Sequence, residues 1–262
     1  MKSSRALLAA LVLAFGCQAP DPIRIVSYNI KHGRGMDGQV DLDRIAGALA
    51  ALDPDVVLLQ EVDEVCARSG NVDEAAFLAE ALGMEARFCT FMDYDGGRYG
   101  LAALSSLPIL ATERIDLPDG TDEPRAAQSL VVDADGKRLR VIGAHLDWKP
   151  DGARRLEQAR VLRAAIIAAA PDVEATILGG DLNARPDSET LRRLTEPQPG
   201  LRPLGPSAPT FPSDAPDRTI DHFLSFAPRS GLTTRVYVAA EPLASDHCPV
   251  VLDLWVQDAV VR

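Results

Sequence analysis

The alternation of apolar and polar positions predicts a chain of many short strands. Runs rich in Val, Ile, Leu and Phe recur between turn-forming residues, as is typical of β-strands. They cover residues 23–30, 55–62, 86–92, 100–106, 109–117, 128–134, 139–148, 175–182, 219–226, 233–240 and 249–256. Two other segments have helical character: residues 41–52, with apolar residues at helical spacing, and the alanine-rich stretch 153–169.

The strands outnumber the helices, which argues against a simple alternating chain with one parallel sheet. Consecutive strands fall into hairpin-like groups, and such groups form mixed or antiparallel sheets. Two sheets stacked face to face, with helices outside, would bury the apolar runs on both sides. We therefore expect an α/β fold of four layers, a sandwich of two stacked mixed β-sheets flanked by helices.

The N-terminal segment has the pattern of an export signal. Lys2 and Arg5 precede an apolar run of ten residues, about half of the roughly 20 that a membrane-spanning helix needs. Gly16 directly before Cys17 resembles the bacterial lipobox, in which the signal is cut and the cysteine is lipidated. We therefore expect a lipid anchor at Cys17 and a membrane-anchored lipoprotein of the cell envelope. The alternative is a secreted or periplasmic protein without the anchor.

The chain divides into three parts on this interpretation. Residues 1–16 are the signal peptide, residues 17–22 a short linker, and residues 23–258 one domain. No linker rich in Ser or Gly, no sustained charge run and no internal repeat divides that domain.

The mature chain is acidic. The whole chain has a formal net charge of −11, and loss of residues 1–16 removes two cations and no acid, which gives −13. A protein that binds nucleic acid without sequence preference usually has a basic face against the phosphates. Nucleic acid is therefore a substrate that the charge disfavours without excluding, because a local basic patch can oppose the net charge.

The four cysteines leave two interpretations open. With Cys17 lipidated, Cys66 and Cys89 could form a disulfide in an oxidising compartment and leave Cys248 unpaired. The alternative is three buried free thiols. No CxxC motif or Cys/His cluster indicates a zinc site.

Polar side chains stand at the ends of five of the predicted strands. They are Asn29, Glu61, His145, Asp181 with Asn183, and Asp221. Burying such groups without a partner costs several kcal/mol, so we expect them to pair with one another or with a metal ion. Strand ends that converge at one rim are also a common place for ligands.

Each of these residues has an ordinary structural explanation when it is taken alone. Asn29 could be a turn amide bonded to backbone, and Glu61 one of several solvated acids of a loop. His145 could be a core histidine, and Asp221 could pair with Arg218. The prediction of a site therefore depends on the set.

The segment LASDHCPVV, residues 243–251, adds a carboxylate and an imidazole side by side. Asp246 and His247 are neighbours, and Pro249 requires extended backbone before the last strand. Because neighbours on a strand point to opposite faces, both can serve one site only if the backbone bends here.

The segment ILGGDLNARP, residues 177–186, places two glycines before a carboxylate and an amide. We expect Gly179 and Gly180 to let the backbone approach a cleft, and Asp181 and Asn183, two positions apart, to face that cleft together. Pro186 then prevents the strand from continuing.

The ordered series SYNI, LLQEVD, GRYGLAALSS, GAHLD, GGDLNARP, TIDHF and SDHCPV resembles the endonuclease/exonuclease/phosphatase superfamily, which has the deoxyribonuclease-I-like fold. The resemblance covers nearly all of residues 23–257. It implies a four-layer α/β sandwich that hydrolyses a phosphoester with a divalent cation, usually Mg²⁺, with Mn²⁺ as the alternative. Mg²⁺ prefers oxygen ligands, which agrees with a site of carboxylates and an amide.

The resemblance also implies roles for single residues. Glu61 resembles the principal metal ligand, with Asn29 beside it and Asp246 as a further or water-mediated ligand. Asp181 and Asn183 resemble the pair that positions and deprotonates the attacking water.

The histidines have counterparts in the same family. His247 resembles the histidine beside the scissile phosphate, with Asp221 as the acid that orients it, and His145 resembles a second phosphate-binding histidine. Arg125 and Tyr99 resemble residues that line the phosphate site. For Arg125 the alternative is a solvated loop arginine, and for Tyr99 it is core packing.

One position departs from some nucleases of this fold. They support the second histidine with a glutamate in the region of DGGRYG, where this chain has Gly97 and Arg98. The partner of His145 is therefore left open by the sequence.

We expect a metal-dependent phosphoester hydrolase, foremost a phosphodiesterase of the cell envelope. Its substrate would be a phospholipid headgroup, a small phosphodiester or nucleic acid, and no protein partner is implied. The alternative is a catalytically silent envelope protein that binds phosphate-bearing ligands in the same cleft.

Overall fold

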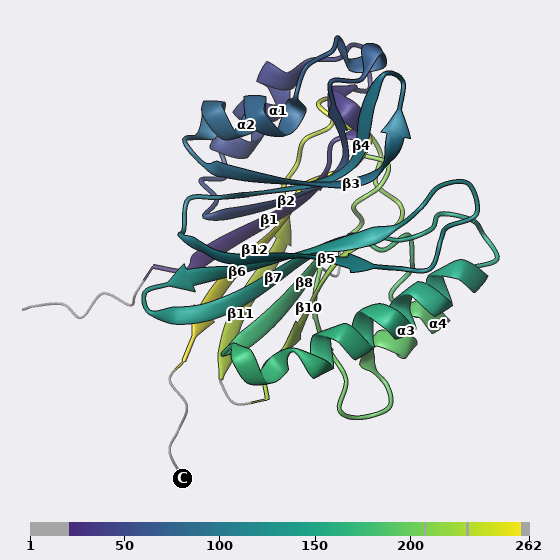
Figure 1. Ribbon diagram of the computed structural model, residues 1–262. Helices are drawn as coiled ribbons and strands as arrows, with labels where there is room; N and C mark the ends of the chain where they lie inside the picture. The colour runs from purple at the N-terminus through teal and green to yellow at the C-terminus, as the bar shows by residue number, and fades with distance from the viewer. Residues whose placement is uncertain (1–20, 207, 229–230, 258–262) are drawn as a thin grey trace, which may run out of the picture.

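Two six-stranded β-sheets stacked face to face form the centre of the computed structural model, which describes residues 21–206, 208–228 and 231–257 (Figure 1). Helices α1 (Leu42–Ala50) and α2 (Glu74–Leu82) cover the outer face of one sheet. Helices α3 (Ala153–Ala168) and α4 (Glu189–Thr195) cover the outer face of the other. The predicted four-layer sandwich of two mixed sheets is confirmed.

The first sheet is built from both ends of the chain. Its order is β11 (Leu232–Val238), β12 (Val250–Val256), β1 (Ile23–Asn29), β2 (Val56–Glu64), β4 (Gly97–Ser105) and β3 (Glu85–Tyr94). Only β1 and β2 are parallel to each other, and the remaining neighbours are antiparallel.

The second sheet is built from the middle of the chain. Its order is β5 (Ile109–Asp116), β6 (Ala126–Ala134), β7 (Lys137–His145), β8 (Ala175–Asp181), β10 (Asp221–Phe226) and β9 (Arg202–Gly205). Here β7 and β8 are the parallel pair. All the strands predicted from the sequence are present.

Two α-helices and one strand were not predicted: α2, α4 and the four-residue strand β9. Helix α2 had a readable signal, because Asp73 accepts a hydrogen bond from the Ala76 N–H as its N-cap and Gly83 ends it at φ 67°. Helix α4 has only seven residues, so its periodicity is hard to recognise.

The core is continuous across the four layers. Leu58, Ile177 and Phe223 are fully buried between the two sheets, while Leu78 and Leu162 fix helices to the outer faces. Fully burying a side chain of this size contributes about 1.5–3 kcal/mol. The stacked sheets are therefore a rigid support for the residues at their rim.

Strand register places the polar ends side by side. Asn29 at the end of β1 pairs with Gln60 on β2. Asp181 at the end of β8 pairs with His145 on one side and with Asp221 at the start of β10 on the other. Parallel and antiparallel pairing thus bring the predicted polar residues to one rim.

The two glycines before Asp181 serve packing and not a cleft, which corrects the expectation from the sequence. A side chain at Gly180, whose φ is 151°, would collide with the backbone of Ala144 on the neighbouring strand. One at Gly179 would collide with the Phe223 ring between the sheets. Small residues let β7, β8 and β10 approach closely just before the site.

Cys66, Cys89 and Cys248 are buried free thiols, which is the alternative without a disulfide. The predicted lipid anchor at Cys17 and the signal peptide lie outside the described residues. Among the helices that the structure describes, none has the length and apolar character to cross a membrane.

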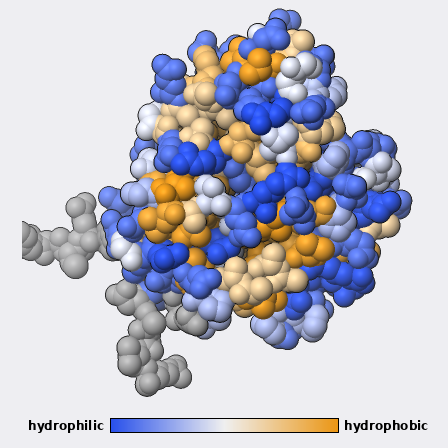
Figure 2. Space-filling view, viewed as in Figure 1, coloured by the Kyte–Doolittle hydropathy of each residue, from blue (hydrophilic) through white to orange (hydrophobic). Residues whose placement is uncertain are grey.

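The view in Figure 2 shows hydrophilic residues over much of the surface, with hydrophobic residues between them in several separate groups. This distribution agrees with the high share of charged residues, 25% of the chain.

Candidate active site

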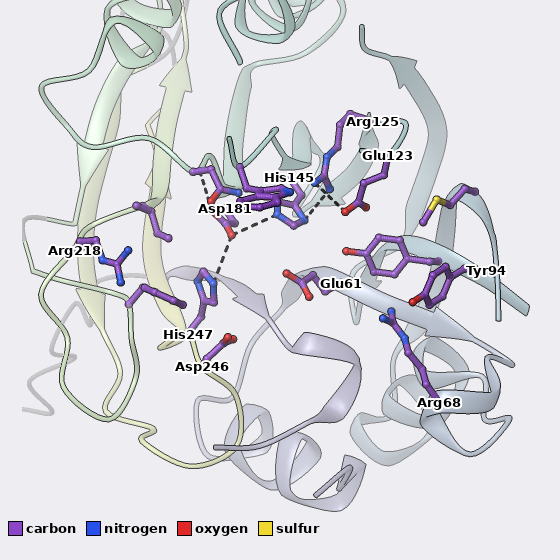
Figure 3. Close-up of a pocket in the computed structure, with 16 residues that line it drawn as sticks. Glu61, Arg68, Tyr94, Glu123, Arg125, His145, Asp181, Arg218, Asp246 and His247 are labelled. Atoms are coloured by element: carbon purple, nitrogen blue, oxygen red, sulfur yellow. Dashed lines mark hydrogen bonds and ion pairs between the residues drawn. The ribbon is translucent and has the colours of Figure 1, made fainter. Parts of the chain in front are cut away.

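A cavity of about 500 Å³ opens where the polar strand ends meet (Figure 3). Most of the predicted site residues line it: Glu61, Tyr99, Arg125, His145, Asp181, Asn183, Asp246 and His247. Asn29 and Asp221 lie directly behind this wall, because both are buried and hydrogen-bond to lining residues. The structure thus brings together all the predicted site residues that it describes.

Asp181 is the centre of the site. Its Oδ2 lies 3.6 Å from Nε2 of His145 and 3.6 Å from Nε2 of His247. The same oxygen accepts a hydrogen bond from Asn29 Nδ2 at 3.2 Å, and Oδ1 accepts one from the Asn183 N–H at 2.8 Å. Burial raises the pKa of Asp181, although the charge of His247 opposes this shift.

His247 is held by Asp221. Its Nδ1 lies 3.1 and 3.0 Å from the two carboxylate oxygens, and the Thr210 hydroxyl donates to Asp221 Oδ2 at 2.5 Å. Burial alone would lower the pKa of His247, but the carboxylates of Asp221 and Asp181 outweigh it and raise that pKa. His247 is therefore an imidazolium at neutral pH, with Nε2 directed at Asp181 on the cavity wall.

The alternative partner for Asp221 does not apply. Arg218 pairs with its neighbour Asp217 at 3.0 Å and lies over the Phe211 ring. Phe211 in turn packs against the imidazole of His247 with ring centroids 4.8 Å apart.

His145 has an arginine as its partner. Arg125 Nη1 lies 3.3 Å from His145 Nδ1, and Arg125 Nη2 lies 3.5 Å from Glu123 Oε1. An arginine can only donate, so Nδ1 accepts and the proton of the neutral imidazole is on Nε2. Burial, then Arg125, then His247 lower the pKa of His145 well below its ordinary value. Arg125 is itself buried, so the alternative of a solvated loop arginine is wrong.

Glu61 reaches the cavity through a break in strand β2. The pairing of β2 with β4 shifts register between Leu59 and Val62, and Glu61 has φ 57° in that bulge. A bulge of this kind redirects one side chain out of the regular alternation. The strand then continues to Glu64, so Glu61 does not begin a solvated loop.

Asn29 links the two carboxylates of the site. Its Nδ2 donates to Glu61 Oε1 at 3.0 Å as well as to Asp181, while its Oδ1 accepts from the Lys31 N–H at 3.1 Å. The amide oxygen is thereby engaged by backbone, and the amide hydrogens hold the two acids toward the same place. Asn29 is therefore both a turn amide, through its oxygen, and a buried residue of the site, through its amide hydrogens.

Asp246 and His247 both face the cavity, which is possible because the backbone bends here. Residues 242–247 form a run of bends before β12. The Asp246 carboxylate forms an ion pair with Lys31 Nζ at 2.6 Å. Lys31 was not singled out from the sequence.

The model of the Endonuclease/Exonuclease/phosphatase family matches residues 26–247 of this chain. The chain belongs to the endonuclease/exonuclease/phosphatase family. The resemblance seen in the sequence is confirmed. Members of this family hydrolyse phosphoester bonds, as nucleases and phosphatases, and typically use divalent metals.

Solved structures of the endonuclease/exonuclease/phosphatase family have the same fold. One from Beutenbergia cavernae is 25% identical with a TM-score of 0.74, over 93% of this chain and 74% of that one. The human Nocturnin catalytic domain with bound sulfate is 20% identical with a TM-score of 0.70, over 90% and 95% of the two chains. A Bacteroides thetaiotaomicron mannosyl-6-phosphatase is 18% identical with a TM-score of 0.67, over 89% and 99%.

Within the described residues, two groups of side chains near the cavity could bind a metal ion. Asp181, Asp221 and His247 are buried and offer atoms within 4.8 Å of one another, but His247 Nδ1 is already bonded to Asp221. Glu61 and Asp181 instead both converge on the Asn29 amide. This second arrangement consists of oxygen donors at an open cavity, and it is the better match for a hard cation that retains waters.

Sequence reasoning missed the side walls of the cavity. Arg68, Tyr94 and Glu123 form one of them, and Arg218 and Phe211 line the opposite one (Figure 3). Arg68 is one cation in an acidic segment, which the sequence pattern treats as a solvated loop. Its role as a wall depends on contacts with residues that are distant along the chain.

Proposed function

We propose that this protein is a divalent-metal-dependent phosphodiesterase. One observation carries the proposal: Asp181 lies between two imidazoles, one held by a carboxylate and the other by an arginine, in the middle of a cavity that extends to both sides. A phosphate bound there would have room for an esterified group toward Arg68 on one side and toward Arg218 on the other. A diester needs both of these spaces, whereas a monoester needs one.

The metal would be held by Glu61, with Asp246 as a further or water-mediated ligand, while Asn29 orients the Glu61 carboxylate and Asp181 is left to act as the base. The residues fit Mg²⁺ because the donors are carboxylate oxygens beside an open cavity, and Mn²⁺ would use the same donors. When bound, such an ion offsets the negative charge of the phosphate oxygens. Asn29 holds the carboxylate of Glu61 in place, and Lys31 limits the repulsion between Asp246 and the other acids.

The chain's own residues supply proton transfer and charge. Asp181 accepts a proton from the attacking water, and the Asn183 N–H holds its other oxygen. His247, charged and held by Asp221, binds a phosphate oxygen. His145 is neutral and donates from Nε2 to another phosphate oxygen.

The proposed location is the cell envelope, with the protein anchored through Cys17. The sequence of residues 1–17 supports it, as an export signal followed by a lipobox-like cysteine. An enzyme in that place meets phospholipid headgroups, small phosphodiesters and extracellular nucleic acid. The acidic chain favours the first two.

The test is hydrolysis of bis-p-nitrophenyl phosphate and p-nitrophenyl phosphate with Mg²⁺, with and without EDTA. We expect the diester to be hydrolysed faster, EDTA to stop the reaction, and His247→Ala to lower the rate at least about a hundredfold. A preference for the monoester would indicate a phosphatase. No turnover of either, or of a lipid and nucleic-acid panel, would favour a silent phosphate-binding protein.

A further inference from the structure

The wall of the cavity around Arg68 is assembled as a fixed recognition surface. Arg68 donates through Nε and Nη2 to the two oxygens of Asp63, at 2.8 and 2.7 Å, and Asp63 is fully buried. The backbone N–H of Arg68 donates to Asp95 Oδ2 at 2.7 Å. A guanidinium held by two parallel hydrogen bonds has little freedom to move.

The Arg68 guanidinium lies beside one face of the Tyr94 ring and of the Tyr99 ring. The Arg68 guanidinium carbon lies 4.4 Å from the centroid of the Tyr94 ring and 5.3 Å from that of Tyr99. The Phe91 ring meets Tyr99 edge to face at 6.0 Å. A flat nucleobase therefore cannot insert between Arg68 and these rings, and on that side the wall presents N–H and hydroxyl groups.

Two polar groups of this wall lack partners within the part of the chain that the structure describes. Arg68 Nη1 makes no hydrogen bond there, although the other two guanidinium nitrogens do. Glu123 approaches Arg125 only through Oε1, and its Oε2 is buried without a hydrogen-bond partner. The wall thus has one unused donor and a carboxylate whose accepting capacity is not filled.

The charges of the wall select between ligand classes. Glu61 and Glu123 both line the cavity, and Asp63 already balances the charge of Arg68. Arg125 likewise pairs with Glu123, so a second anionic group would meet carboxylates and, among the described residues of this wall, no cation without a partner, and would be repelled. A hydroxyl group avoids that repulsion, because it both donates to a carboxylate and accepts from a guanidinium.

We infer that the Arg68, Tyr94 and Glu123 wall binds the polyhydroxylated alcohol of a phosphodiester, such as a sugar or another polyol. Arg68 Nη1 donates to one hydroxyl oxygen, and Glu123 accepts from a neighbouring hydroxyl. The hydroxyl of Tyr94, a residue that is 40% exposed, completes the set (Figure 3). This inference rests on the proposed phosphodiesterase function and specifies its substrate class.

The test compares two diesters that differ only in hydroxyl groups and ring oxygen. Glucose esterified at its 6-position to 4-nitrophenyl phosphate is compared with cyclohexylmethyl 4-nitrophenyl phosphate. Hydrolysis is followed as loss of the diester, so that cleavage of either ester bond is counted. We expect kcat/KM of the wild-type protein with Mg²⁺ to favour the glucose diester at least about tenfold.

The wall variants are Arg68→Lys and Glu123→Gln. Lysine retains the charge beside Asp63 but loses the fixed fork, and we expect each variant to reduce the preference to about threefold or less. Arg98→Lys is the matched control. Arg98 also pairs with an acid, Glu64, and lies over an aromatic ring, but it is outside the cavity, so its variant should keep the wild-type preference.

The outcomes separate the two proposals. Hydrolysis of both diesters at equal rates, or wall variants that retain the preference, would overturn the polyol inference and leave the phosphodiesterase standing. If no diester is hydrolysed, the proposed function fails. Calorimetric titration with glucose 6-phosphate then tests the polyol inference. We expect Glu123→Gln to bind this ligand more weakly than wild type and Arg98→Lys do. Equal binding by all three proteins would overturn the inference.

Discussion

Arg125 donates to Nδ1 of His145 across 3.3 Å, so the two imidazoles that flank Asp181 differ in charge. His247 has a carboxylate, Asp221, at the equivalent nitrogen and is cationic. In Arg125→Gln we expect the pKa of His145 to move back toward its ordinary value, because the adjacent cation is gone.

NMR titration of the His145 ring protons measures that change directly, and hydrolysis of bis-p-nitrophenyl phosphate should fall about 10- to 100-fold. Arg218→Gln, on the opposite wall, is the control for the titration and should leave the His145 resonance where it is. An unshifted His145 in Arg125→Gln would show that the two side chains are not coupled.

Asp221→Asn tests the support of His247. The amide can no longer stabilise an imidazolium, so the pKa of His247 should fall and kcat should drop at least about tenfold at neutral pH. Asp217→Asn changes an exposed carboxylate nearby and serves as the control. Unchanged turnover of Asp221→Asn would remove Asp221 from the mechanism.

Asp181→Ala tests the proposed base. We expect hydrolysis to fall about 10²- to 10⁴-fold while the fold is preserved, because the side chain is buried at the rim and not in the apolar core. Circular dichroism and the unfolding temperature check the fold, and the diester assay checks activity. Activity near that of wild type would assign the base to another residue.

Glu61→Gln tests the metal site. In the wild type we expect Mg²⁺ to raise the unfolding temperature, since an ion that binds only the folded state stabilises it by about 2.7 kcal/mol at 100 times its Kd. The variant should need at least about tenfold more Mg²⁺ for the same rise. Glu64→Gln, on the same strand but outside the cavity, should behave like wild type.

Glu74 makes stability depend on pH. It is fully buried with one oxygen bonded to the Asp63 N–H at 2.8 Å, and burial raises its pKa to about 8. The folded state therefore keeps a proton that the unfolded chain has already released. The contribution of this proton to the free energy of unfolding is complete below about pH 4, the pKa of Glu74 in the unfolded chain. It is lost as the pH rises through about 8, its pKa in the folded state.

Glu74→Gln cannot ionise. Its free energy of unfolding, relative to that of wild type, should therefore increase between pH 5 and pH 9 by at least ~2 kcal/mol. Urea unfolding at both values measures the difference. Glu80→Gln changes an exposed acid of the same helix and should show no such trend. A constant difference between Glu74→Gln and wild type would mean that Glu74 is ionised in the folded protein.

Local pattern was sufficient for the main architecture. The apolar runs predicted every strand except the four-residue β9. Their number and grouping predicted two stacked sheets. The polar residues at the strand ends were recognisable as a set for the same reason. A carboxylate or imidazole that closes an apolar strand is unusual whatever its partner is.

The family resemblance implied the pairing of Asp221 with His247 and of Asn29 with Glu61, and the other partners were decided only by the tertiary structure. Arg125 is bonded to His145, Lys31 to Asp246 and Arg68 to Asp63, and in the first two pairs the residues lie 20 and 215 positions apart. Chain spacing carries no information about such contacts. Whether an arginine is solvated or buried depends on what folds over it, so the sequence left Arg125 open.

What the sequence by itself determined is the four-layer fold, the family and the types of residue at the rim. What only the tertiary structure decided is the bulge that turns Glu61 into the cavity, the charge of each histidine and the wall around Arg68. The physical reason is that strand formation follows local periodicity. Protonation and recognition follow burial and distance, which arise only when distant segments pack together.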